Sequence, residues 1–451
     1  AKAAEARGAP LPAGRAALDR RAYHIARELA GGITRDGVVT STLDVRLQSL
    51  AEERARAYAA RLDDGATLAL MIVDARTRAV RAAVGSASLK APGGWMDLTA
   101  AVRSPGSALK PIIYGLAFEE GLAGPDTVID DMPQSFDGYA PENFDRTFRG
   151  EVRLSDALQH SLNVPAVTLL DRLGAERLAA VLTASGVRLK APKRAGREFG
   201  LTLALGGAGV TMRDLATLYA GLANDGAVAP LVWRVEEEGA KAHAFQMFSP
   251  TSARRIREIL ADAPALEGRA PARLSRTAPR VAYKTGTSYG YRDAWAAGTA
   301  GAYAAVVWVG RADGAPRPGE TGRKAAAPLL LDLFDIVARV DREAPLGQEQ
   351  QAEDGDIAIA RIAAPRRKAP PEIVFPRDGV EIYSGGERGV VLAARGGAGD
   401  YIWYVGGEPV ATEATSGKAV WRPQAPGFYD VVVVDRDGRS ARAKVRVAAA
   451  G

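Results

Sequence analysis

The chain of 451 residues contains no cysteine, and this absence excludes several kinds of chemistry. A thiol nucleophile, a thiolate metal site and a disulfide framework are all ruled out. Histidine is scarce as well, with only His24, His160 and His243. None of the three lies in a recognisable triad or zinc-binding pattern. The sequence therefore predicts no metal site and gives no support to a Ser-His-Asp mechanism.

Long apolar runs are also missing, because no segment approaches the roughly 18 apolar residues that a membrane-spanning helix requires. The chain begins Ala-Lys-Ala-Ala rather than with methionine and shows no signal peptide. We therefore expect a fragment whose natural start lies upstream. The net charge is +6, and without a block of Lys or Arg the sequence predicts no nucleic-acid partner. The excess of arginine fits either a dispersed, solvated surface or attraction to an anionic polymer.

Composition and periodicity predict a mixed α+β protein in four segments. We expect residues 1–36 to be an N-terminal tail or linker remnant with a short helix, and residues 37–340 to form the main domain. A shift to Gln, Glu, Asp and Pro predicts a linker over 341–371. Short strands then predict a small all-β, sandwich-like domain over 372–451, with Trp403 and Trp421 in its core.

Within the main domain, the apolar pattern changes between helical and strand spacing. Asp44 is a plausible cap for a helix that reaches Leu62, and residues 68–84 resemble a hairpin. The pattern then predicts a helix over 107–118, a mostly helical region over 154–225 with breaks at 161–165 and 206–209, strands within 281–309, and a last helix ending near 340.

Three short motifs occur in one order: Ser107-Ala-Leu-Lys110, Ser161-Leu-Asn163 and Lys284-Thr-Gly286. Each is weak alone and also fits an ordinary structural role, such as a helix start, a helix cap or an exposed strand. Their combination is much more specific, because this chain has only three asparagines and Lys-Thr-Gly is rarer still. The set predicts a serine acyltransferase whose base is a lysine.

The spacing within each motif suits that chemistry. Ser107 and Lys110 are three residues apart, so on a helix they share a face and Lys110 can take the proton of the Ser107 hydroxyl. Lys110 must be neutral to do so, and burial or a nearby cation such as Lys284 would lower its pKa. Ser161 and Asn163 lie in a predicted break between helices, where a hydroxyl can relay a proton and an amide can hold a peptide carbonyl.

The third motif predicts a strand that receives a substrate. Gly286 is expected to leave room for another backbone to lie alongside that strand. A substrate peptide that adds to this edge would be held by main-chain hydrogen bonds. Lys284, Thr285 and Thr287 are expected to bind a terminal carboxylate.

With these motifs and their flanks, the chain resembles the transpeptidase half of the class A penicillin-binding proteins over about residues 37–340. The flanks that carry the resemblance are Arg103–Pro111, Gly150–Leu158, Ser161–Val167, Leu203–Gly206, Ala220–Gly226 and Tyr291–Trp295. The trailing β segment is similar to the extra C-terminal domain of the penicillin-binding protein 1C subgroup. The resemblance implies the penicilloyl-serine transferase (β-lactamase-like) fold, an antiparallel five-stranded sheet flanked by helices.

The resemblance also implies a reaction, peptidoglycan D,D-transpeptidation. Ser107 would attack the D-Ala-D-Ala bond of a stem peptide, with Lys110 as base and Ser161 assisting proton transfer. The other implied roles are substrate binding by Asn163, Lys284, Thr285, Gly286 and Thr287, and an oxyanion hole made by the backbone N–H groups of Ser107 and Thr287. β-Lactam antibiotics would acylate the same serine, and no cofactor is implied.

The resemblance implies a location in the periplasm, at the outer face of the inner membrane. Full-length members also carry a membrane anchor and a glycosyltransferase domain upstream, and we expect neither in this sequence. The C-terminal β domain is expected to meet a cell-wall or protein partner. Other functions stay open on the same motifs: a D,D-carboxypeptidase or β-lactamase, in which water replaces the acceptor amine, and a β-lactam sensor or scaffold.

Overall fold

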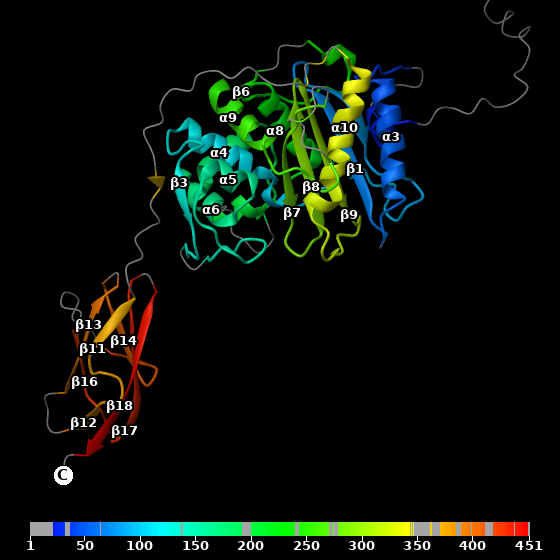
Figure 1. The fold of residues 1–451 in the computed structure, drawn as a ribbon. Coiled ribbons are helices and arrows are strands. Elements are labelled where there is room, and N and C mark those ends of the chain that lie inside the picture. Colours follow the sequence, from blue (N-terminus) through cyan, green and yellow to red (C-terminus); the bar gives the residue numbers. More distant parts are fainter. Residues whose placement is uncertain are drawn as a thin grey trace, which may run out of the picture. The chain divides into compact units, whose positions relative to one another are not determined.

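In the computed structural model of the protein, five strands rich in Val and Ala form an antiparallel sheet in the order β2-β1-β9-β8-β7 (Figure 1). The strands are β1 (Thr67–Asp74), β2 (Ala79–Val84), β7 (Ala282–Thr287), β8 (Asp293–Ala300) and β9 (Tyr303–Gly310). Every residue of β1, β8 and β9 is buried, as expected for strands covered on both faces. β7 lies at one edge of the sheet and carries Lys284, which pairs in register with Ala297 of β8.

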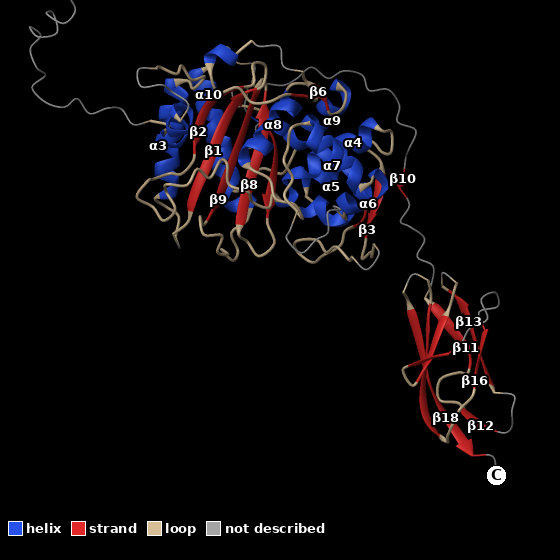
Figure 2. Ribbon diagram, turned by 180° about the vertical axis from the view of Figure 1, so that it is seen from behind, coloured by secondary structure: helices blue, strands red, loops and turns tan. Residues whose placement is uncertain are grey.

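Helices cover both faces of this sheet (Figure 2). On one face, α3 (Val45–Ala59) and α10 (Ala327–Val340) share a hydrophobic core with the strands. On the other, α8 (Met212–Ala223) contacts β1, β8 and β9. Asp44 caps α3 as predicted, by accepting hydrogen bonds from the N–H groups of Arg46 (2.9 Å) and Leu47 (2.8 Å). The predicted fold, an antiparallel five-stranded sheet flanked by helices, is confirmed.

A second group of helices surrounds α4 (Lys110–Glu119), of which every residue from Lys110 to Phe118 is buried. Its members that contact α4 are α5 (Leu154–Gln159), α6 (Asn163–Leu173) and α9 (Pro250–Ala261), and α7 (Ala175–Ala184) packs on α6. Short elements complete this part: β3 (Val128–Asp131), β4 (Gly150–Arg153), β5 (Ala227–Val228), β6 (Phe245–Gln246), β10 (Arg361–Ile362), the 3₁₀ helices Gly106–Leu109, Leu201–Leu205 and Val235–Glu237, and a π-helical turn, Gly322–Ala326. β10, β3 and β4 form a three-stranded sheet.

The predicted short N-terminal helix is α2 (Tyr23–Ala30). It packs on the main unit rather than standing apart, because Ile25 is buried and the ring of Tyr23 meets that of Trp95 edge-on. Arg213 of α8 binds both Glu28 of α2 (2.6 Å) and Asp97 (2.7 Å). This part of the predicted tail is therefore a folded element of the domain.

The C-terminal unit, formed mainly by residues 363–451, is all β. Its two sheets have the orders β11-β13-β16 and β12-β18-β17-β14-β15. The strands are β11 (Pro371–Phe375), β12 (Glu381–Ser384), β13 (Val390–Gly396), β14 (Ile402–Val405), β15 (Glu408–Val410), β16 (Lys418–Trp421), β17 (Gly427–Val434) and β18 (Ser440–Ala449). Trp403 and Trp421 belong to the buried core between them, as predicted.

The structure describes residues 21–31, 37–63, 65–136, 139–191, 200–239, 243–269, 274, 278–342, 344, 346, 361–362, 370–384, 389–397, 399–410, 418–436 and 438–449. Most of the predicted tail (1–36) and most of the predicted linker (341–371) lie outside these residues. Across the described ranges, the helices are all too short or too polar to cross a membrane.

Candidate active site

Ser107 lies in a single 3₁₀ turn, Gly106–Leu109, that runs directly into α4. Gly106 makes this turn possible, because its φ is +53° and a Cβ atom there would lie 2.5 Å from the carbonyl oxygen of Thr287. The turn of the first motif therefore packs against β7, the strand that carries the third motif. Ser107 itself is half-buried.

Two buried aromatic side chains hold the backbone on either side of Ser107. The indole N–H of Trp295 on β8 donates to the carbonyl oxygen of Ser104 (2.9 Å). The hydroxyl of Tyr219 on α8 donates to the carbonyl oxygen of Ala108 (2.9 Å). Both side chains are fully buried, so water cannot replace these bonds if they break. Sequence reasoning missed Tyr219, which carries no motif signal.

Gly286 leaves room for another backbone to come close. A Cβ atom on Gly286 would lie 2.1 Å from the carbonyl oxygen of Pro105, two residues before Ser107. A Cβ atom on Gly322 would in turn lie 2.4 Å from the carbonyl oxygen of Gly286. The close neighbour of Gly286 in the structure is thus the chain's own backbone, and the approach of a substrate backbone to the same strand stays a prediction. A sequence pattern shows that a small residue is needed but not which segment approaches it.

Lys110, the first residue of α4, joins the first motif to the second. Its Nζ donates to the carbonyl oxygens of Ser161 (2.7 Å) and Leu162 (2.9 Å) and to Oδ1 of Asn163 (2.7 Å). None of these three acceptors belongs to Ser107, one turn away. Three acceptors match the three donors of a lysine ammonium.

The burial and the neighbouring charge of Lys110, by contrast, favour the neutral amine. Its side chain has no solvent exposure. Burial and, next in size, the nearby charge of Lys284 hold the pKa of Lys110 well below its ordinary value, and Asp131 opposes them. The sequence predicted both causes of the lowered pKa; it did not predict Asp131.

Ser161 lies between α5 and α6 with a φ of +59°. This is a left-handed backbone conformation that residues other than glycine rarely adopt. This conformation turns its carbonyl oxygen toward Lys110. Backbone strain of this kind persists where the surrounding structure enforces it, often at a functional site. The predicted break between helices is present, although α6 already begins at Asn163.

Asn163 is held by a loop that sequence reasoning did not place at the site. Its backbone N–H donates to Oδ1 of Asn143 (2.7 Å), and its Nδ2 donates to the carbonyl oxygen of Glu142 (2.6 Å). Asn143 in turn binds the buried carboxylate of Asp131. Two of the chain's three asparagines therefore meet here. The scarcity of asparagine was the one feature of the sequence that could have pointed to Asn143.

Lys284 is buried, with 2% of its surface exposed, and its Nζ donates to the carbonyl oxygen of Thr285 (3.2 Å). Burial and then the charge of Arg323 lower its pKa to about 7. Because successive side chains of a strand leave on opposite faces, the half-buried Thr285 and Thr287 lie on the other face of β7 from Lys284. The Thr287 hydroxyl accepts from the N–H of Gly322 (3.0 Å), which leaves its own O–H to donate.

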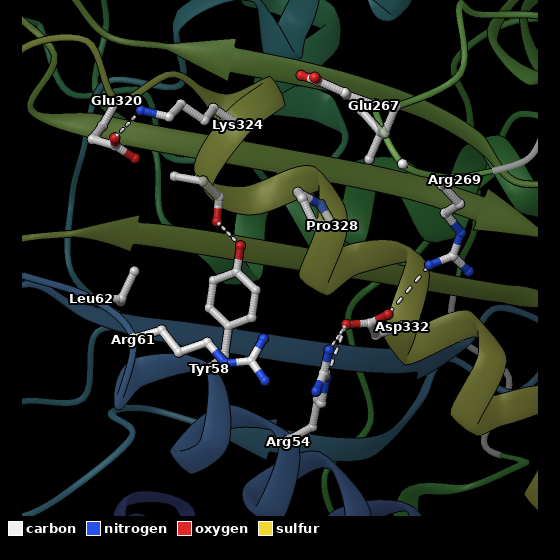
Figure 3. Close-up of a pocket in the computed structure, with 13 residues that line it drawn as sticks. Arg54, Tyr58, Arg61, Leu62, Glu267, Arg269, Glu320, Lys324, Pro328 and Asp332 are labelled. Atoms are coloured by element: carbon white, nitrogen blue, oxygen red, sulfur yellow. Dashed lines mark hydrogen bonds and ion pairs between the residues drawn. The ribbon is translucent and has the colours of Figure 1, made fainter.

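A cavity of about 490 Å³ opens elsewhere, between α3, α10 and the loop before β7 (Figure 3). None of the predicted site residues lines it. Five of its charged side chains bind one another: Arg54 and Arg269 both pair with Asp332, and Lys324 pairs with Glu320 (2.6 Å). We therefore assign no ligand to it. Across the described ranges, no cluster of His, Asp and Glu could hold a metal ion.

Comparison with known proteins identifies both units. Residues 68–335 match the family model of the penicillin binding protein transpeptidase domain, and residues 361–447 match that of the Penicillin-Binding Protein C-terminus Family. Penicillin-binding protein 1C of Escherichia coli strain K12 is 40% identical over 309 residues, which are 68% of this chain and 39% of that protein. Penicillin-binding protein 1F of Bacillus subtilis strain 168 is 30% identical over 307 residues, 64% of this chain and 41% of that protein.

The fold is also that of a solved structure, PonA1 from Mycobacterium tuberculosis in complex with penicillin V. The TM-score is 0.59 at 22% identity, over 76% of this chain and 98% of the other. The chain spans about two fifths of the length of the curated relatives above. It belongs to the penicillin-binding protein transpeptidase family, as its three motifs predicted.

Proposed function

We propose that this chain is a peptidoglycan D,D-transpeptidase that forms an acyl-enzyme on Ser107 and acts outside the cytoplasm. One observation carries the proposal: the three motifs meet. Lys110 is hydrogen-bonded to Ser161, Leu162 and Asn163, while the Ser107 turn lies against Thr287. The nucleophile Ser107, the buried amine of Lys110 and the hydroxyl-bearing strand β7 thus belong to one site.

In the first half of the reaction, Oγ of Ser107 attacks the carbonyl carbon between the two D-alanines, and its proton passes to neutral Lys110. The three acceptors around Nζ stabilise the ammonium that forms. The C–N bond then breaks, and Ser161 passes a proton from Lys110 to the leaving amine. D-Alanine departs, and the rest of the peptide is esterified to Ser107.

Two groups of donors support this step. The backbone N–H groups of Ser107 and Thr287 form the oxyanion hole, consistent with the close approach of Gly106 to the Thr287 backbone. The hydroxyls of Thr285 and Thr287 bind the terminal carboxylate, and Lys284 supplies a positive charge beneath them from the other face of β7.

In the second half, the amine of a neighbouring stem peptide attacks the ester carbon. A new amide bond forms, the Ser107 oxygen leaves and regains a proton, and two stem peptides are cross-linked. A β-lactam enters by the first half-reaction, but its opened ring stays attached and the serine remains acylated.

The test is a donor–acceptor assay. A pentapeptide ending in D-Ala-D-Ala and a second stem peptide with a free side-chain amine are incubated with the wild-type chain. We expect release of D-alanine and a cross-linked dimer in the wild type and with Ser155→Ala, a half-buried serine on α5, and neither product with Ser107→Ala. D-alanine release without dimer would assign a carboxypeptidase, and no release from a penicillin-reactive chain would assign a sensor.

A further inference from the structure

We propose that Asp131 and Asn143 are positioning residues for the acylation of Ser107: they anchor the Ser161–Asn163 turn against Lys110 and place a buried carboxylate near that lysine. This inference rests on the proposed function, because it concerns the base of the same reaction. Asp131 ends β3, and Asn143 lies in the loop between β3 and β4.

The hydrogen bonds of Asn143 allow only one orientation of its amide. Nδ2 donates to both carboxylate oxygens of Asp131 (2.9 and 2.8 Å) and to the carbonyl oxygen of Thr147 (2.8 Å). A carboxylate only accepts hydrogen bonds, so the nitrogen must face Asp131. Oδ1 then faces the other way and accepts from the backbone N–H of Asn163 (2.7 Å).

The same constraint continues to Lys110. The Asn163 amide donates through Nδ2 to the carbonyl oxygen of Glu142 (2.6 Å), so its Oδ1 faces Lys110 Nζ (2.7 Å). An amine hydrogen needs an acceptor there, which fixes this amide as well. Asp131, Asn143, Asn163 and Lys110 thus form one chain of hydrogen bonds with a single direction of donation.

Burial makes this chain costly to disturb. Asp131 and Lys110 have no solvent exposure, and Asn143 has 4%. Asp131 forms no ion pair with any described residue; apart from Asn143, its donor is the backbone N–H of Arg149 (3.0 Å). A buried carboxylate is expensive without a countercharge. The nearby group whose positive charge Asp131 can balance is the protonated base, Lys110.

The effect of this carboxylate extends over the buried side of α4. Among the described residues, the charges that act on Lys110 are Lys284 from β7, which lowers its pKa, and Asp131 from β3, which raises it. Tyr114, one turn along α4 from Lys110, responds to Asp131 too: burial and then Asp131 raise its pKa. Asp131 is therefore the group that keeps the Lys110 pKa from falling further.

The test measures the second-order rate of acylation by a fluorescent penicillin against pH. The acidic limb of this profile reports Lys110, because acylation needs the neutral amine and the rate rises as Lys110 loses its proton. In Asp131→Asn the opposing charge is gone, the Lys110 pKa falls, and the limb moves to lower pH. In Asn143→Ala the Asp131 carboxylate stays, but the backbone of Asn163 loses its hydrogen bond to Asn143. We therefore expect the acidic limb of the rate profile not to move to lower pH, and the plateau rate to fall about 10- to 100-fold.

Asp130→Asn is the matched control, because it removes the same charge one residue away, from the other face of β3. We expect its profile to follow the wild type. Thermal melting checks that each variant folds. A folded Asp131→Asn with the wild-type limb, or a folded Asn143→Ala with the wild-type plateau, overturns the inference. If Asp131→Asn does not fold, the plateau of Asn143→Ala decides alone. A wild type that penicillin does not label refutes the proposed function instead.

Discussion

Some of the groups around Lys110 favour its neutral amine, and others favour its ammonium. Burial and Lys284 favour the neutral amine, which can accept the proton of Ser107. The carbonyl oxygens of Ser161 and Leu162, Oδ1 of Asn163 and the charge of Asp131 favour the ammonium that results. A general base works best when the two states are close in free energy. This balance is why a fully buried lysine suits the proposed reaction.

Lys284 should limit the reaction at high pH. Burial and Arg323 lower its pKa to about 7, so its positive charge is lost as the pH rises through 7. We expect the rate of acylation by a penicillin to fall over that range, since the penicillin carboxylate loses its partner charge. With the methyl ester of the same penicillin, which has no carboxylate, this alkaline limb should disappear.

A pair of neighbouring cations provides the control. Arg323→Gln should raise the Lys284 pKa and move the alkaline limb to higher pH, because one source of repulsion is gone. Lys324→Gln removes an exposed charge that pairs with Glu320 and should leave the limb in place. Equal profiles for the free acid and the ester would show that Lys284 does not act through the carboxylate.

Ser161 has a hydroxyl and a strained backbone. Two variants distinguish the contribution of the hydroxyl to acylation from the effect of the backbone on stability. Ser161→Ala and Ser161→Gly both lack the hydroxyl, so acylation should fall by about 10²- to 10⁴-fold in each. Glycine tolerates the φ of +59°, so Ser161→Gly should be more stable than Ser161→Ala by about 1 kcal/mol in urea unfolding. Wild-type acylation by Ser161→Ala would remove the hydroxyl from the mechanism.

At the scale of elements, the site depends on how closely the Ser107 turn packs on β7. Gly106 and Gly286 allow this contact from opposite sides, and Gly322 packs on the same strand from the π-helical turn. Such contacts between backbones set the distance from Ser107 to β7, the strand proposed to bind the carboxylate. A single methyl group at the contact should therefore affect both stability and activity.

Gly106→Ala and Gly121→Ala test this contact, because both glycines have a positive φ (+53° and +65°). At Gly121 nothing lies within 4 Å of the new Cβ atom, so only the backbone strain remains, about 1–2 kcal/mol. At Gly106 the clash with Thr287 adds about 1–3 kcal/mol, and penicillin labelling should be lost. The measurements are urea unfolding and labelling. Equal losses of stability in the two variants would contradict the role of the contact.

The sequence predicted elements better than the contacts between them. The Asp44 cap, the hairpin over 68–84 and the break before Asn163 each have a local signal within a few residues. The bond from Asn143 to Asn163 and the approach of Gly286 to Pro105 join residues far apart in the chain, and no periodicity reports them. The three motifs predicted one shared site, and within it the side chains of Lys110 and Asn163 are hydrogen-bonded. The supports, Tyr219, Asn143 and Asp131, became visible only in three dimensions.

At the scale of the molecule, the two units have separate hydrophobic cores. One core lies between the five-stranded sheet and the helices α3 and α10. The other includes Trp403, Val431 and Val445 of the C-terminal unit. Units with cores of their own can in principle unfold separately.

Two buried tryptophans test that independence. Trp403→Ala removes a fully buried side chain from the C-terminal core, at a cost of about 3–5 kcal/mol. We expect one early melting transition in calorimetry and unchanged penicillin labelling. Trp308→Ala makes a similar change in β9 and should abolish labelling. Loss of labelling in Trp403→Ala would show that the C-terminal unit supports the catalytic one.

The most direct test of the mechanism is to locate the acyl group. The wild-type chain is treated with a penicillin, digested, and mapped by mass spectrometry, with Ser107→Ala treated in parallel. The mechanism predicts one penicilloyl adduct, on the peptide that contains Ser107, and none in a folded Ser107→Ala. An adduct on Ser161 or any other residue, or one that persists in Ser107→Ala, would contradict it.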